Sequence, residues 1–458
     1  MKDPILNARL DVLEQELILT NDQNTWKEKL CLKKLVIEDE DLFREWNKFT
    51  GLVGDELEKQ KEILKSIREK LKEIEPLSDS TAEQVLSQAW TDYGNALNRS
   101  QAVFREFLEF VGGLILRDKE FDSEICDVAD ELIKSCSRLV LTNTSIAVPA
   151  ARDALTTAAG LMVRVRFPEW TIWTLPFTAY EYGHVVLNEL TKFTDLIATE
   201  VDKWLKQDPD FQTLEADKQA TQESKQLLKK HAESYVKEFL ADIFAAYMMG
   251  PAYVCSAILL RFDPVGSSVK DTERPDDIRR GFVVLEVLNR MNQESHSKPY
   301  TGVIEYLEDE WKGTKDRVKS SAKLEAWEEA RLKALVDGWK GSKFYKLTKY
   351  PDSGQLDGWN FAAQWAQEWL TQLSNGIYQL KPPQKITHLS KLRDVLNAAW
   401  FCRIPDPGNP NSLTGISSGA EVDSVERAAR SLCAEISFKI AKQKQDELKD
   451  KIARGFPK

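Results

Sequence analysis

The sequence predicts a mainly α-helical protein, and three observations support this prediction. Apolar residues recur at helical spacing along most of the 458 residues, and the alternating patterns typical of strands are rare. The hydrophobic fraction of 42% is sufficient for a sizeable core, and the charged fraction of 30% for a solvated surface. We therefore expect a multi-helical core, flanked by a helical N-terminal arm and a helical C-terminal domain.

Residues 1–76 are expected to form the helical or coiled-coil arm. Its apolar positions fall on a heptad stripe that Gln60 interrupts and Pro76 ends: Val53, Leu57, Leu64, Ile67, Leu71 and Ile74. The favoured interpretation is an amphipathic helix that packs on its own domain. The alternative is a seam through which two copies of the chain form an oligomer.

Residues 77–160 are predicted to form a helical domain. Helices are expected over Thr81–Asp118 and Glu124–Val140, and Pro149 is placed near the start of another helix that reaches toward residue 161. The segment Met162–Leu175 is rich in β-branched and aromatic residues, so it is expected to form one or two short strands or an extended lead-in. Pro176 then opens a helix, as proline commonly does in a first turn.

Residues 161–295 are expected to form the central core. One long helix is predicted over Phe177–Lys206 and ends at the Asp208-Pro209-Asp210 break. A second is predicted over Glu215–Met249 and is stopped by Gly250-Pro251, and a third over Asp277–Asn292 follows a polar loop at 265–277.

The remaining chain is also predicted to be helical. Residues 296–403 form a Trp-rich helical domain whose indoles are expected to be core rather than binding pockets, and residues 404–422 a flexible loop. Residues 423–458 form a C-terminal helix and an exposed tail, with Asp423 and Glu426 as its capping pair.

Composition and charge exclude several classes of function. The net charge is −10, so nucleic-acid binding is not expected, because phosphate affinity comes from clustered Lys and Arg. The window Phe239–Leu260 is nearly long enough to span a membrane, but the Gly-Pro break and Asp242 favour a buried helix. Six scattered Cys without a C-x-x-C pair, and an N-terminal segment unlike a signal peptide, favour a reducing, cytoplasmic setting.

Two short segments carry most of the chemical information. In Tyr180-Glu-Tyr-Gly-His184, residues 180 and 184 share a helix face, and Glu181 points slightly aside. In Glu238-Phe-Leu-Ala-Asp242, two carboxylates lie one turn apart. Zinc sites use this spacing, since two ligands at i and i+4 bind the metal while a Glu takes the proton of the zinc-bound water.

These two segments resemble the signature regions of bacterial gluzincin metallopeptidases, in which an H-E-x-G-H helix is followed by an E-x-x-A-D helix. The flanking Trp-x-Leu-Pro and Gly-Pro-Ala-Tyr segments add to the resemblance, which covers about 110 residues of a zincin-like core. The resemblance implies Glu181 as the general base, His184 and Glu238 as zinc ligands, and Asp242 as a carboxylate that orients a ligating His. A peptide or protein would then be the substrate.

The chain departs from the family pattern at two places. Tyr180 stands where the first ligand His is expected, so the third zinc ligand is Tyr180 itself or is missing. His231 is a poor replacement, because it lies two turns, about 10.5 Å, from Glu238. After the second helix, Arg274 stands where related enzymes carry a His, and Arg279 follows it.

The sequence therefore leaves two functions open. The first is a zinc metallopeptidase-like hydrolase with an altered metal site, and the second is a catalytically inactive relative that serves as a protein-interaction scaffold or sensor.

Overall fold

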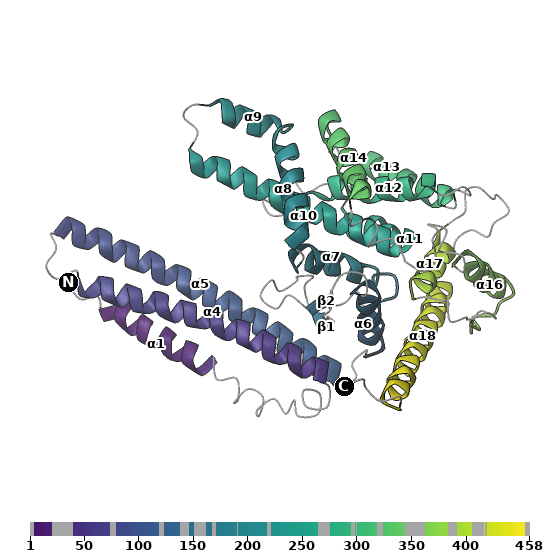
Figure 1. Cartoon of the computed structure of the whole chain (residues 1–458), viewed down its shortest axis with the longest axis horizontal. Coiled ribbons are helices and arrows are strands. Elements are labelled where there is room, and N and C mark those ends of the chain that lie inside the picture. Colours follow the sequence, from purple (N-terminus) through teal and green to yellow (C-terminus); the bar gives the residue numbers. More distant parts are fainter. Residues whose placement is uncertain are drawn as a thin grey trace. The chain divides into compact units, whose positions relative to one another are not determined.

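The computed structural model is mainly helical, as predicted, with one two-stranded sheet (Figure 1). The chain divides into two compact units: unit 1 comprises residues 1–121 and 148–167, and unit 2 comprises residues 122–147 and 168–458. The structure describes residues 4–20, 40–73, 79–118, 123–137, 146–150, 162–166, 171–189, 191–217, 221–263, 275–294, 298, 300–317, 324–342, 345, 362–382, 392–404, 416 and 419–453.

Unit 1 is built on a long helical hairpin of α4 (Glu40–Lys72) and α5 (Asp79–Asp118), with α1 (Pro4–Thr20) beside it (Figure 1). The heptad positions Val53, Leu57, Leu64 and Ile67 are buried, and so is Gln60. Leu71 is half-buried, and Ile74 lies outside the described residues. The stripe thus packs on its own unit, as favoured above. Oligomer formation stays a prediction.

The two-stranded sheet pairs β1 (Ile146–Ala150) with β2 (Met162–Arg166). Strand β2 confirms the β-rich prediction for its segment. The helix predicted to begin near Pro149 is wrong at that point, because Pro149 lies within β1. Both strands of such a sheet are edge strands, where the missing N–H of a proline costs no ladder hydrogen bond.

Unit 2 contains the remaining elements. They are α6 (Ser123–Ser137), α7 (Phe177–Glu189), α8 (Thr191–Leu205), α9 (Pro209–Ala216), α10 (Gln222–Met249), α11 (Pro251–Ser256), the π-helix η1 (Ala257–Arg261), α12 (Asp277–Glu294), α13 (Thr301–Arg317), α14 (Ala326–Gly341), α16 (Ala362–Ser374), α17 (Leu392–Arg403) and α18 (Gly419–Ala453).

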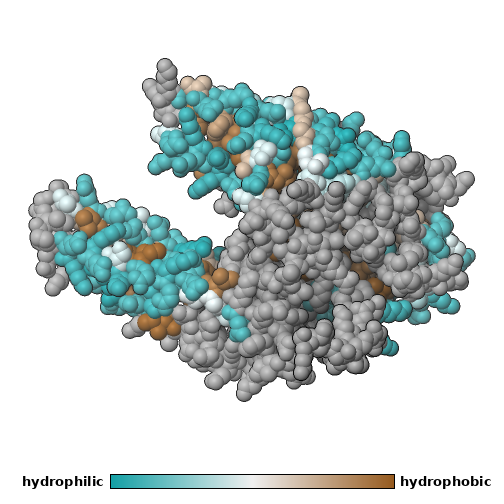
Figure 2. Space-filling model, in the orientation of Figure 1, coloured by the Kyte–Doolittle hydropathy of each residue, from teal (hydrophilic) through white to brown (hydrophobic). Residues whose placement is uncertain are grey.

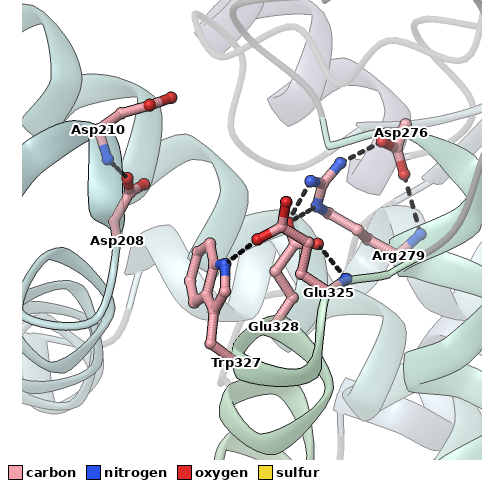
Figure 3. Close-up of polar contacts among 7 residues, drawn as sticks. All are labelled: Asp208, Asp210, Asp276, Arg279, Glu325, Trp327 and Glu328. Atoms are coloured by element: carbon pink, nitrogen blue, oxygen red, sulfur yellow. Dashed lines mark hydrogen bonds and ion pairs between the residues drawn. The ribbon is translucent and has the colours of Figure 1, made fainter.

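Several predicted boundaries need correction. The single helix expected over 177–206 is observed as two helices, α7 and α8. Asp208 begins a helix rather than only ending one, since its carboxylate caps α9 by accepting the N–H of Asp210 at 2.9 Å (Figure 3). The second long helix begins at Gln222, not at Glu215.

Helix α10 lies at the centre of unit 2, packed by α7, α8 and α12. Its second half is buried without interruption from residue 238 to residue 249. Gly250 ends it with a φ of 63°, which favours glycine, and Pro251 starts α11. Asn397 of α17 bridges this break, because its amide accepts from the Ala252 N–H at 2.8 Å and donates to the Met249 carbonyl at 2.9 Å.

The buried helix expected in the window 239–260 is therefore observed, broken at Gly250-Pro251. Among the described helices, none is long and apolar enough to cross a membrane. The surface in Figure 2 is largely hydrophilic over the described residues, with small separate hydrophobic patches.

The C-terminal part of unit 2 is held together by indoles. Four are fully buried, as predicted for core residues: Trp339, Trp365, Trp369 and Trp400. The capping pair predicted at residues 423 and 426 is wrong, because α18 already begins at Gly419. The Glu426 carboxylate instead accepts the backbone N–H of Ile172 at 3.2 Å and so holds the turn that precedes α7.

Candidate functional site

The two signature segments lie on neighbouring helices, α7 and α10, which pack closely through Gly183. A Cβ at this glycine would lie 3.2 Å from the Cα of Ala241 and 3.2 Å from a ring carbon of Phe244. Both distances are shorter than ordinary van der Waals contact, so only glycine lets the helices approach this far. The approach brings the faces that carry Tyr180, His184 and Glu238 together.

Tyr180 occupies the position of the missing His and bonds directly to the predicted zinc ligand on the other helix. Its buried hydroxyl donates a hydrogen bond to Oε2 of Glu238. Burial, together with the neighbouring carboxylates Glu238 and Asp242, raises the pKa of Tyr180 well above its usual value, although Arg280 opposes the shift. The phenol therefore keeps its proton and acts as a donor.

His184 lies at the edge of this pair. Its Nε2 is 3.6 Å from Oε1 of Glu238, and its ring meets the ring of Tyr180 edge to face at 4.7 Å between centroids. His184 is half-buried, whereas the predicted general base Glu181 is only 5% exposed. Three of the predicted residues, His184, Glu238 and Tyr180, are thus within contact of one another.

Asp242 is completely buried and is bound by an arginine from α12. Arg280 donates from Nε to Oδ2 and from Nη2 to Oδ1 of Asp242, both at 2.9 Å. Tyr253 of α11 donates to Oδ1 at 2.5 Å. Burial raises the pKa of Asp242 against the opposing effect of Arg280 and Tyr253. A carboxylate buried in this apolar setting needs a partner, and the partner is a guanidinium.

The Arg280 guanidinium also reaches the rest of the site. Its Nη1 lies 4.0 Å from Oε2 of Glu238, and its central carbon lies 4.7 Å from the ring centroids of both Tyr180 and Phe262. Burial opposes its charge, but Asp242 and the other anionic partners outweigh burial and raise the pKa of Arg280 well above its usual value. A permanent positive charge therefore lies between α7, α10 and α12.

Sequence reasoning missed Arg280 and considered Arg274 and Arg279 instead. Arg274 lies outside the described residues. Arg279 binds elsewhere: it pairs with Asp276, and its Nε donates to Glu328 of α14 at 2.8 Å (Figure 3). Successive helical residues point about 100° apart, so two adjacent arginines serve two different clusters. The available signal was the apolar run after Arg280, which indicates a buried position.

The other histidines do not supplement the site as far as the structure describes them. His231 is half-buried on α10, two turns before Glu238. His296 and His388 lie outside the described residues.

The residues present do not fit a catalytic zinc site. Such a site needs three protein ligands and an open position. The 3.6 Å between His184 and Glu238 is close to the roughly 3.3 Å expected between two ligands at ordinary zinc bond lengths. The third position, however, carries a protonated phenol, and a guanidinium lies beside Glu238. Among the described residues, no group of three His, Cys, Asp or Glu side chains is placed to hold a metal.

No protein-family model, curated protein or solved structure matches this chain. The likeness to gluzincins therefore rests on the two short segments and the residues that flank them.

Proposed function

We propose that this protein is a non-hydrolytic relative of the metallopeptidase type, which keeps the paired helices of that site and acts by recognising other proteins. The observation that supports the proposal most is the hydrogen bond from Tyr180 to Glu238. This bond places a protonated phenol where the missing zinc ligand would stand, and it links α7 to α10. The site residues then serve to stabilise a helical core.

A groove on unit 1 supports the recognition part of the proposal. It measures about 480 Å³ and runs between α4 and α5, lined by Gln60, Ile63, Ser66, Ile67, Lys70, Asp92, Asn95, Ala96 and Arg99. We call it the hairpin groove. Ile63 is 41% exposed there, although it is apolar.

The way in which helix α1 packs on α4 indicates what kind of segment could bind in the hairpin groove. Its Asp11 and Glu14 accept hydrogen bonds from Arg68 of α4 at 2.6 and 2.7 Å. Lys70 lies two residues further and so points roughly 200° round the helix, away from α1 and toward the groove. Lys70 already pairs there with Asp92 of α5 at 3.0 Å. We propose that a partner's amphipathic helix lays its apolar face on Ile63 and that its acidic residues compete with Asp92 for Lys70.

Hydrolysis is tested with the purified chain and its Glu181→Gln variant. Both are incubated with zinc and a mixture of peptides of varied sequence, and the products are identified by mass spectrometry. We expect no product that depends on Glu181. Cleavage by the wild type that the variant lacks would refute the proposal and restore the hydrolase assignment.

Recognition is tested by substituting one groove residue and one matched residue outside it. Ile63→Asp places a charge in the hairpin groove, while Leu108→Asp places one on α5 at a position that is 47% exposed and does not line the groove. The two variants are compared in binding an acidic amphipathic helix peptide. We expect Ile63→Asp alone to weaken binding by about 10-fold or more. Equal binding by both variants would exclude this surface.

The setting is also part of the proposal. The described cysteines Cys126, Cys255, Cys402 and Cys433 are buried free thiols, which supports a reducing, cytoplasmic compartment.

A further inference from the structure

We infer that Arg280 supplies, as part of the chain itself, the positive charge that a metal ion supplies in the sites this one resembles, and that it excludes divalent cations from the site. The inference deepens the proposed function, because it explains how two buried carboxylates are compensated although, among the described residues, no set of metal ligands is complete. It rests on the geometry of α7, α10 and α12.

The two carboxylates of α10 explain the need for a cation. Glu238 and Asp242 lie one turn apart on the same face, and both are buried. Buried carboxylates without a counter-charge are strongly unfavourable. Arg280 satisfies Asp242 by two hydrogen bonds of 2.9 Å, and its Nη1 lies 4.0 Å from Glu238. The single guanidinium therefore offsets the charge of Asp242 directly and lowers the cost of burying Glu238 beside it.

The same guanidinium opposes a second cation. A zinc ion held by His184 and Glu238 would share the Glu238 carboxylate with Arg280, whose Nη1 lies 4.0 Å from Oε2 of that group. At an effective dielectric constant near 20, two unit positive charges about 4 Å apart already repel by roughly a thousandfold in binding constant, and the double charge of Zn²⁺ strengthens the repulsion. Tyr180 adds a second obstacle, because a protonated phenol hydrogen-bonded to Glu238 stands where a third metal ligand is needed. Both obstacles must be removed before the site accepts a metal.

The test measures zinc binding by four proteins: wild type, Tyr180→His, Arg280→Gln and the double variant Tyr180→His with Arg280→Gln. Each is purified without an affinity tag that binds metal, and its zinc affinity is measured by competition with a chromogenic chelator. We expect the wild type to retain less than about one zinc per ten chains. The double variant should bind one zinc at least about 100-fold more tightly than either single variant.

A further variant separates charge from shape. The double variant Tyr180→His with Arg280→Lys keeps a positive charge and should stay weak in zinc binding. Equal zinc affinity in the Lys and Gln variants would overturn the inference. Near-stoichiometric zinc in the wild type, lost in the His184→Ala variant, would also overturn the inference. This second result can be obtained even if the Arg280 variants do not fold. Circular dichroism establishes that each variant is folded.

These outcomes distinguish the inference from the proposed function. A zinc-free wild type that cleaves peptides through Glu181 would refute the non-hydrolytic assignment and leave the role of Arg280 intact. A zinc-loaded wild type that cleaves nothing would refute the role of Arg280 and leave the non-hydrolytic assignment intact.

Discussion

The ion pair between Asp242 and Arg280 should be among the most sensitive points of unit 2. Asp242 is 0% exposed, and the Arg280 side chain is 9% exposed, so neither partner can turn to solvent when the other is removed. Breaking a buried pair by removing one partner typically costs about 3–5 kcal/mol. A domain has only about 5–15 kcal/mol of stability in total. Either single substitution should therefore remove a large share of the unfolding free energy.

A double-mutant cycle tests this reasoning. Asp242→Asn changes the charge with little change of volume and leaves an oxygen for the Tyr253 hydroxyl, while Arg280→Met keeps an apolar chain of similar reach. Each single variant should lose about 3–5 kcal/mol, because it leaves one charge buried without its partner. The double variant should lose less than the sum by at least about 2 kcal/mol, because no unpaired charge remains.

The free energies come from urea unfolding followed by tryptophan fluorescence, which reports on unit 2 through its buried indoles. Circular dichroism measured in parallel checks that each transition is a single step. Two results would refute the reasoning: single variants that lose less than about 1 kcal/mol, or a double variant whose loss equals the sum of the two singles. The second result would mean that the two groups do not interact.

Three further predictions follow from the packing. Gly183→Ala should destabilise the protein by about 1–3 kcal/mol through overpacking against α10, whereas Gly94→Ala, which meets nothing within 4 Å, should stabilise its helix by roughly 0.5–1 kcal/mol; thermal unfolding compares them. Tyr247→Phe should be neutral or stabilising at pH 7, because among the described residues the hydroxyl has no hydrogen-bond partner. Burial and Glu294 raise the pKa of Tyr247 above the usual 10.0, so the folded wild type loses stability as the pH rises above 10, where the unfolded chain ionises this phenol. The Tyr247→Phe variant lacks this phenol, so above pH 10 its unfolding free energy should fall by about 1.4 kcal/mol less per pH unit than that of the wild type. Burial also raises the pKa of three thiols, which should resist a disulfide reagent at pH 8 until guanidinium is added: Cys255, Cys402 and Cys433.

Each of these three predictions has a result that contradicts it. Equal effects of alanine at residues 183 and 94 would mean that α7 and α10 are further apart than described. An unchanged alkaline slope in the Tyr247→Phe variant would mean that this phenol ionises in the folded protein. Rapid labelling of the three thiols without denaturant would mean that the core of unit 2 opens readily.

The central helices were predictable because their signals are local. The apolar run of α10, the Gly250-Pro251 stop and the heptad stripe of α4 each lie within one element, and helical periodicity reports them directly. The proximity of residues 180, 184 and 238 was also implied, since the motif places them on facing sides of a helix pair. The sequence was thus sufficient to predict features that depend on the pattern of residues on a single helix face.

The rest depended on contacts between distant segments. Arg280 lies 38 residues from Asp242, and the apolar run that follows it indicates burial without naming the carboxylate that it binds. The strand that contains Pro149 is stabilised by pairing with β2, a contact that the local sequence around Pro149 does not encode. Glu426 accepts its hydrogen bond from Ile172, 254 residues away, so its local spacing from Asp423 does not reveal this role.

The bridge made by Asn397 has a consequence for how the chain folds during its synthesis. The carbonyl of Met249, at the end of α10, receives its hydrogen bond from a side chain that lies 148 residues later. At about 5–20 residues per second, the ribosome needs roughly 7 to 30 seconds to make that stretch. During this time the end of α10 lacks its Asn397 hydrogen bond, and α11 lacks the contacts that it makes with α17 in the folded chain. Nascent chains stalled before residue 397 should therefore engage chaperones, and chains stalled well after α17 should release them.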